Sequence, residues 1–359
     1  MVNAKPTEHP PAAQQTWAIE AWRGFAALMV VWVHWGPTLG WPMGIMHFAF
    51  TGVDLFFVLS GFVFAPTLFA GQTPALRAYA IRRAARIYPA YLAALALYAL
   101  LAWHAGRPLL HLPEHLLMLQ MQSREMVFYY NPVFWSLPTE VSFYALVPLL
   151  ALWLSRDTRW RWPLLFALAL ALRLALVRPA DGAAQNWAYL SLHHLPGLLV
   201  EFLLGAWVWQ RHTAVPLHAP CRTPAWVLAA LGIAGWLALA LLYLQLERWS
   251  GISDWRNGQI ALAAAVCFAL VLRASLRCPA PAVGSLAWHC GRWAGKLSYP
   301  LYLLHTAWLI PAHALLAHGW SRWLVSTLAI AGLLASCWLL HQWVEEPARQ
   351  IGRRWAARY

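Results

Sequence analysis

Long apolar runs recur along this chain and are separated by short polar segments. A run of about 20 apolar residues forms a helix long enough to cross the hydrocarbon core of a bilayer. The pattern therefore predicts an all-α fold, a polytopic membrane helix bundle of about ten transmembrane helices. The predicted spans cover residues 22–36, 48–70, 87–103, 135–154, 162–177, 196–210, 225–244, 258–273, 297–317 and 322–343.

The composition agrees with this pattern. Of the 359 residues, 61% are apolar and only 11% are charged, compared with roughly 25% charged in ordinary soluble domains. A soluble globule has too few polar residues here to cover its surface. Intrinsic disorder is excluded as well, because disordered chains are poor in apolar and aromatic residues.

The net charge of +13 follows the predicted topology. If the N-terminus is cytoplasmic, 19 of the 26 Lys and Arg residues fall in cytoplasmic segments and six in outer connections. The remaining one, Arg173, lies near the outer end of a predicted span, where a long side chain can reach the interface. This bias is the positive-inside pattern. It predicts cytoplasmic N- and C-termini and contact with membrane lipids, and it argues against a nucleic-acid partner.

One membrane domain is predicted over residues 17–345. Residues 1–16 are polar and lack an apolar core, so we expect a disordered cytoplasmic leader and not a cleaved signal peptide. Residues 346–359 are expected to form a basic cytoplasmic tail. The longest outer connection, His104–Phe134, mixes apolar and polar residues. It is either an interfacial helix with aromatic anchors or a lid over an outward-facing site.

No metal centre is predicted. The five cysteines include no Cys-x-x-Cys pair, and none falls in a predicted outer connection. His111 and His115 have the spacing of two ligands on a helix, but no third ligand is evident. His193 and His194 fall in a predicted loop.

The first predicted span, WRGFAALMVVWVHW, carries Arg23 and His34. They are 11 residues apart, almost three helical turns, so both lie on one stripe roughly 16 Å apart along the axis. One ligand in a channel would then contact both, and an imidazole is suited to general-base catalysis at neutral pH. Alternatively, Arg23 only marks the cytoplasmic end of the span and His34 only hydrogen-bonds a neighbouring helix.

Three predicted spans carry buried acids, which are rare in membranes because a central charge costs about 2.5–3.5 kcal/mol on insertion scales. Asp54 lies in FTGVDLFFVLSGF, Glu140 follows Pro138 in FWSLPTEVSFYALVP, and Glu201 lies in VEFLLGAW. Asp54 either orients a histidine or arginine on a neighbouring helix or closes a structural pair.

The segment RRAARIYPAY, at the entrance of the third predicted span, carries a dense arginine cluster. Arg86 is three residues from Arg83 and four from Arg82, so these side chains share a helix face. Guanidinium groups at a helix N-terminus suit phosphate. Basic residues on this side also serve topology, but the cluster is denser than orientation requires. In the ninth span, KLSYPLYLLH places Tyr299, Tyr302 and His305 three residues apart as a polar ribbon.

Seven of these segments occur in a familiar order: WRGFAALMVVWVHW, GVDLFFVLSGF, RRAARIYPAYL, WSLPTEVSFY, VEFLLGAW, KLSYPLYLLH and VEEPARQIGRR. The chain resembles the acyltransferase 3 family of integral membrane acyltransferases, which O-acylate bacterial surface glycans. The resemblance implies a multi-pass protein of the bacterial inner membrane. It also implies acyl-CoA as a cytoplasmic donor substrate, no permanently bound cofactor, and a glycan or lipid-linked sugar as acceptor.

Carried over by motif, Arg23 and His34 correspond to the family's first-helix pair, and Arg83 and Arg86 to its RxxR element. Glu140 corresponds to the acid of WSLxxE, whose first residue is Trp135. Family members commonly have a second acid after that glutamate, whereas this chain has Val141. The departure affects the expected acceptor and not the reaction.

These residues support an enzyme that moves an acyl group, expected to be acetyl, from acyl-CoA to a sugar hydroxyl. Arg82, Arg83 and Arg86, with Arg23 nearby, would hold the CoA phosphates. His34 would act as general base or carry the acyl group itself, with Glu140 or Asp54 orienting it. Tyr299, Tyr302, His305, Trp135 and Glu201 would line the channel or the acceptor site. The alternative is a proton-coupled transporter that uses the buried acids and histidines as a proton path.

Overall fold

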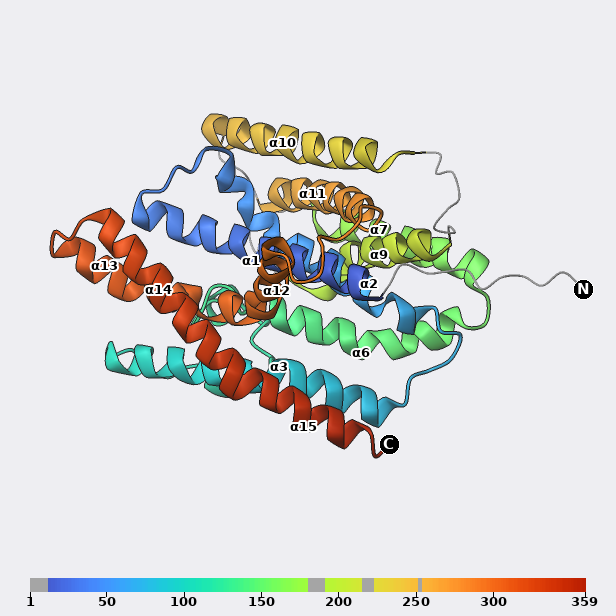
Figure 1. The fold of residues 1–359 in the computed structure, drawn as a ribbon, viewed down its shortest axis with the longest axis horizontal. Helices are drawn as coiled ribbons and strands as arrows, with labels where there is room; N and C mark the ends of the chain where they lie inside the picture. Colours follow the sequence, from blue (N-terminus) through green and yellow to red (C-terminus); the bar gives the residue numbers. More distant parts are fainter. Residues whose placement is uncertain (1–11, 180–190, 215–222, 251–253) are drawn as a thin grey trace, which may run out of the picture.

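The computed structural model describes residues 12–179, 191–214, 223–250 and 254–359. Within these ranges the protein is built of helices and contains no strand (Figure 1). The prediction of an all-helical bundle is therefore confirmed. The predicted leader falls mostly on residues 1–11, which lie outside the described residues, and the first helix begins at Ala12.

Each of the ten predicted spans coincides with a helical segment. The long helices are α1 (Ala12–Leu39), α2 (Gly52–Leu68), α3 (Leu76–His104), α6 (Ser136–Leu154), α7 (Thr158–Leu176), α9 (Leu195–Thr213), α10 (Ala225–Ser250), α11 (Asp254–Ser275), α12 (Leu286–Leu304) and α14 (Arg322–Leu340).

Shorter elements connect or extend them. Helix α12 continues through η2 (His305–Trp308) into α13 (Leu309–Ala317), and α14 continues through η3 (His341–Glu345) into α15 (Glu346–Ala356). The 3₁₀ helix η1 (Gly44–Thr51) precedes α2, and α4 (Leu112–Leu116) and α5 (Arg124–Val127) lie in the connection after α3.

Seven helical segments of the described chain are long and apolar enough to cross a membrane, those that contain α2, α3, α6, α10, α11, α12 and α14. Helices α1, α7 and α9 are not among the seven, and each carries charged residues along its length. The protein is thus a membrane helix bundle, while ten crossings and cytoplasmic termini stay predictions.

Polar caps begin several of these helices. Ser285 accepts a hydrogen bond from the backbone amide of Trp288 at the start of α12, and Ser321 accepts one from Leu324 at the start of α14. Asp157 does the same for Arg159 before α7. Such side chains satisfy amides that have no partner in the first turn, so these three helices begin where a cap is available.

Four helix pairs pack most extensively: α1 with α12, α2 with α9, α10 with α11, and α3 with α15. In Figure 1 the red α15 runs alongside the start of α3, and α10 lies at the edge of the bundle. Gly61 of α2 and Gly205 of α9 allow close contact, because a Cβ atom at either position would overlap a backbone oxygen of the opposite helix. Small residues permit such close packing in membranes.

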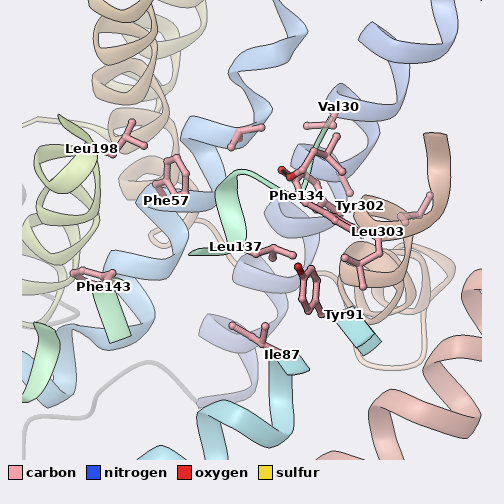
Figure 2. Packing of buried hydrophobic residues seen from close by; sticks show 14 of the residues in the cluster. Val30, Phe57, Ile87, Tyr91, Phe134, Leu137, Phe143, Leu198, Tyr302 and Leu303 are labelled. Carbon is pink, nitrogen blue, oxygen red and sulfur yellow. Dashed lines mark hydrogen bonds between the residues drawn. The ribbon is translucent and has the colours of Figure 1, made fainter. Parts of the chain in front are cut away.

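A large aromatic and aliphatic core fills the bundle (Figure 2). Tyr91 of α3 and Phe134, just before α6, are fully buried, and their rings meet edge to face at 5.0 Å. Tyr302 and Leu303 of α12 belong to the same cluster. This core fixes α3, α6 and α12 around the functional side chains described below.

Candidate active site

Helix α1 carries Arg23 and His34 on one stripe, as the spacing predicts, and each side chain is half-buried beside a cavity. Arg23 borders a cavity of about 170 Å³, called here the arginine cavity. His34 borders a second cavity of about 340 Å³, the histidine cavity. Val53 and Tyr302 line both cavities, so the two spaces adjoin.

Three guanidinium groups surround the arginine cavity, those of Arg23, Arg83 and Arg86. Among the described residues none of the three forms an ion pair within 4 Å. Three unpaired cations facing one small space repel one another and favour an anion between them.

Arg83 is held in place by aromatic rings. Its guanidinium carbon lies 4.5 Å from the ring centre of Phe64, 5.6 Å from that of Tyr79 and 5.8 Å from that of Tyr144. Arginine stacks well on aromatic faces, and these contacts leave its N–H edges available to a ligand.

The structure changes two details of the predicted arginine cluster. Helix α3 begins at Leu76, so Arg83 and Arg86 lie about two turns inside the helix and not at its N-terminus. Side chains, and not free backbone amides, would therefore bind an anion here. Arg82 is exposed and lines neither the arginine cavity nor the histidine cavity.

Glu140 of α6 lines the arginine cavity. It accepts hydrogen bonds from Ser60 of α2 (3.0 Å) and from Tyr144, one turn further along α6. Tyr299 lines the same cavity and donates to the carbonyl of Ile87 at 2.9 Å. The sequence prediction that Glu140 could orient His34 finds no contact in the structure, since the described partners of Glu140 are these two hydroxyls.

Tyr302 separates the arginine and histidine cavities. Its hydroxyl lies 2.7 Å from the Ser136 hydroxyl and 2.8 Å from the carbonyl of Val133. These bonds fix the phenol ring of α12 against the start of α6. The predicted ribbon of Tyr299, Tyr302 and His305 thus begins at the arginine cavity and ends at His305, which contacts His34.

His34 and His305 form a hydrogen-bonded pair. The His34 Nδ1 atom lies 2.8 Å from the Val30 carbonyl and 3.3 Å from His305 Nε2. His305 is fully buried, and its Nδ1 atom lies 3.0 Å from the carbonyls of Leu301 and Tyr302.

These contacts assign the tautomers of both rings. A carbonyl only accepts, so Nδ1 carries the proton in His34 and in His305. The Nε2 atom of His305 then accepts from His34 Nδ1. The Nε2 atom of His34 keeps its lone pair and has no hydrogen-bond partner within the described ranges. It is the nitrogen left to accept a proton or to attack an acyl group.

Asp54 lies in a buried charge cluster next to the histidine cavity. Its carboxyl group interacts electrostatically with Glu201 and Arg173, and Glu201 lies 3.6 Å from Arg173. The Arg173 guanidinium also donates to the carbonyls of Gly197 (2.7 Å) and Gly258 (2.5 Å). Of the two alternatives for Asp54, this pairing favours the structural one, and no hydrogen bond joins Asp54 to His34 among the described contacts.

The prediction that Arg173 reaches the membrane interface is wrong. Its side chain is 1% exposed, because α9 and α11 cover it and supply its hydrogen-bond acceptors. Asp54 and Arg173 both line the histidine cavity, so the cluster gives this cavity a charged wall.

The connection after α3 folds over the histidine cavity. Arg124 and Trp135 line it together with His193, whose ring meets that of Trp135 edge to face at 4.6 Å. His115 of this connection is fully buried. No group of three or more metal-ligating side chains occurs in the part of the chain that the structure describes.

A third cavity, which the sequence analysis did not identify, borders the helix α15 and is called here the tail cavity. Its volume is about 340 Å³, and it shares Arg23, Arg86 and Tyr299 with the arginine cavity. Lys296 and Arg349 add two further cations to its lining. The three cavities therefore form a row along α1, from its N-terminal half to His34.

Comparison with known proteins identifies the family. A family model described as an acyltransferase domain, that of acyltransferase 3, matches residues 16–342. The chain belongs to the acyltransferase 3 family. The resemblance carried by the seven sequence segments is thereby confirmed, and the family makes the protein a membrane acyltransferase in preference to a transporter.

One curated relative of this acyltransferase 3 protein is nodulation protein 10 of Rhizobium leguminosarum bv. viciae. The two sequences are 24% identical over 375 residues, which covers 94% of each chain. No solved structure matches the chain.

Proposed function

We propose that this acyltransferase moves an acetyl group from cytoplasmic acetyl-CoA to a hydroxyl of an envelope or extracellular glycan. The observation that carries the proposal is the arginine cavity, in which Arg23, Arg83 and Arg86 face one space without an ion-pair partner among the described residues. Guanidinium groups bind phosphate through charge-assisted bonds, and acyl-CoA brings the phosphates that such a site requires.

The charge distribution supports a cytoplasmic donor site. The N-terminal half of α1, α15 and the start of α3 border the arginine and tail cavities, and the predicted topology places these segments inside the cell. The protein would then lie in the bacterial inner membrane, with the histidine cavity further toward the opposite face.

The order of the cavities supports an acyl chain that extends along α1. Arg23 and His34 are 11 residues apart on α1, which corresponds to roughly 16 Å along the helix axis. With phosphates at the arginine cavity, the thioester arm would pass Tyr302 and bring its carbonyl carbon to His34. Because Tyr302 lines both cavities, the thioester arm would either pass beside its side chain or require that side chain to move.

His34 would perform the proton transfers. Its Nε2 atom would take the proton of the acceptor hydroxyl while the oxygen attacks the thioester carbonyl carbon. The C–S bond would then break, and the imidazolium would return its proton to the departing thiolate. Ester and free CoA thiol are formed without any other reactant.

A covalent route would use the same nitrogen. His34 Nε2 would attack the thioester carbonyl carbon, and the C–S bond would break to release CoA as the thiolate. The acceptor hydroxyl would then attack the acyl-imidazolium, its proton would pass to the thiolate, and free His34 would be regenerated. Labelled acyl-CoA distinguishes the two routes: an acylated protein trapped without acceptor supports the covalent one. Ternary-complex kinetics without such a species support direct transfer.

The histidine cavity is the proposed acceptor site. It combines an aromatic face from Trp135 with polar groups from Asp54 and Asn257. Sugars present hydroxyl groups that donate to carboxylates and amides, and apolar C–H faces that pack on indole rings. The departure at Val141 leaves the kind of glycan to experiment.

The deciding experiment uses membranes that contain the protein and acetyl-CoA labelled in the acetyl group. We expect CoA release that depends on added acceptor, with the label recovered in the glycan by mass spectrometry. Membranes with His34→Gln control for other transferases. CoA release that is independent of the protein, or unlabelled glycan, would contradict the proposal.

A further inference from the structure

The tail cavity is lined by more cations than the donor diphosphate alone requires. Arg23 and Arg86 border it on the side of the arginine cavity, and Lys296 and Arg349 border it elsewhere. Two acids, Glu20 and Glu345, also line it. The cations therefore exceed the acids in this lining.

Each acid contacts a basic group outside the lining, and Glu345 also lies 3.9 Å from Arg349 of the lining. Glu20 pairs with Arg292 at 3.4 Å, and one oxygen of Glu345 lies 2.9 Å from His341 Nδ1. The two acids of the lining therefore offset at most two of its four cations. An anion would reduce the repulsion between these cations.

The charged groups of Lys296 and Arg349 differ in how they are held. Arg349 pairs with Glu346 at 3.3 Å and lies 3.9 Å from the other oxygen of Glu345, so α15 fixes its guanidinium at the rim. Lys296 is exposed, and its ammonium lies 4.9 Å from the Trp293 ring centre without a carboxylate within 4 Å among the described residues. A guanidinium held by ion pairs and an exposed ammonium can together bind a terminal phosphate.

Arg23 and Arg86 mark the boundary between the two spaces, because both line the arginine cavity and the tail cavity. A ligand that crosses this boundary would meet cations on either side of it. Acyl-CoA has matching chemistry, since a diphosphate joins its thioester arm to a nucleoside that carries a separate 3′-phosphate.

We propose that the tail cavity is a second anion subsite, in which Lys296 and Arg349 bind the 3′-phosphate of the CoA nucleoside. Arg23 and Arg86 then hold the diphosphate at the boundary, and Trp209 provides an aromatic wall beside the adenine. This assignment rests on the proposed function. It makes the protein selective for CoA over nucleotides that lack the 3′-phosphate.

Binding of CoA and of 3′-dephospho-CoA to the purified full-length protein in nanodiscs tests the subsite. A charge-assisted hydrogen bond is worth about 1.5–3 kcal/mol, so we expect wild type to bind CoA at least about 10-fold more tightly. In the double variant Lys296→Gln, Arg349→Gln this ratio should fall close to one, because only CoA binding weakens.

Two further variants locate the effect. Arg86→Gln should weaken both nucleotides by similar factors, because the diphosphate is common to them. Arg354→Gln removes a charge from an exposed position of the same helix α15 and should change neither affinity.

The outcomes separate this proposal from the proposed function. Equal affinity of wild type for the two nucleotides, or a ratio that persists in the double variant, would overturn the subsite while leaving CoA as donor. Absence of binding by either nucleotide would overturn both the acyl-CoA donor and the subsite.

Discussion

The Nδ1 atom of His34 lies 3.3 Å from the Nε2 atom of His305, a residue 271 positions further along the chain. Because His305 is buried and its own Nδ1 atom faces two carbonyls, only its Nε2 lone pair is available to His34. Together with the Val30 carbonyl, 2.8 Å from the same nitrogen, this contact holds the His34 tautomer whose Nε2 atom is free, and we propose that His305 is a positioning residue. A neutral ring occupies the place that a carboxylate holds in a serine-protease triad.

Substitution of His305 should lower turnover, and the size of the loss should depend on whether the new side chain can accept a hydrogen bond from His34. We expect His305→Leu to reduce kcat by about 100-fold, as misplacement of a catalytic group does, with little change in KM for acyl-CoA. His305→Gln keeps a carbonyl acceptor and should recover most of the activity. Equal losses in both variants would indicate a packing role and contradict the positioning role.

Replacement of His34 tests the base itself. His34→Gln should reduce acyl transfer by at least the 10²–10⁴-fold typical of a general base, whereas the amount of protein in the membrane stays near the wild-type level. Transfer assays and immunoblots of the same membranes measure the two quantities. His313→Gln changes an exposed histidine at the end of the same bundle and is the matched control. Activity near wild type in His34→Gln would remove His34 from the mechanism.

Arg82 and Arg86 of α3 differ in exposure, so their substitutions should affect acyl-CoA binding differently. Arg86 lines the arginine cavity, while Arg82, one turn earlier on α3, is exposed. Arg86→Gln should weaken acyl-CoA binding about 10-fold or more, the value of a lost charge-assisted contact, and Arg82→Gln should not. The loss should be largest at low ionic strength, because salt already screens part of the attraction in wild type. Titration calorimetry at two salt concentrations measures both effects, and equal affinities of the two variants would argue against the phosphate site.

The sequence was sufficient for features that depend on helical periodicity. Arg83 and Arg86 are three residues apart, and any helix places them on one face beside whatever packs there. It was not sufficient for the contact between His34 and His305, which depends on the register of α1 against α12. That register follows from close approaches such as Gly24 against Ala294, where an added Cβ would overlap the neighbouring helix. Spacing within one segment carries no information on such contacts.

The burial of Arg173 is a second feature that spacing within one helix could not predict. By position in its span it resembles an arginine that reaches the interface. Its partners, Glu201 and the carbonyls of Gly197 and Gly258, come from α9 and α11. The tertiary packing of these helices closes over the guanidinium, and no local pattern in α7 indicates that cover.

Removal of the Arg173 charge should destabilise the bundle. Arg173→Leu leaves the carboxyl groups of Asp54 and Glu201 buried without a cation, and breaking a buried pair in this way costs about 3–5 kcal/mol. The double variant Arg173→Leu, Glu201→Leu should recover a large part of this loss, because it removes the stranded acid. Unfolding of the detergent-solubilised protein measures both, with the exposed Arg178→Leu as control. A single variant as stable as wild type would contradict the charge pairing.

His115 gives the connection between α3 and α6 a pH dependence. Burial lowers the pKa of this imidazole from its usual 6.5, and the ring lies outside the membrane-spanning helices. Below pH 6.5 the unfolded connection therefore binds more protons than the folded one, so its stability should fall as the pH falls, by at most about 1.4 kcal/mol per pH unit. Hydrogen exchange of residues 112–120 should thus be faster at pH 5.5 than at pH 7.5 after correction for intrinsic rates. His115→Gln should remove this difference and His318→Gln, at an exposed site, should keep it; a difference that survives His115→Gln would assign the effect to another group.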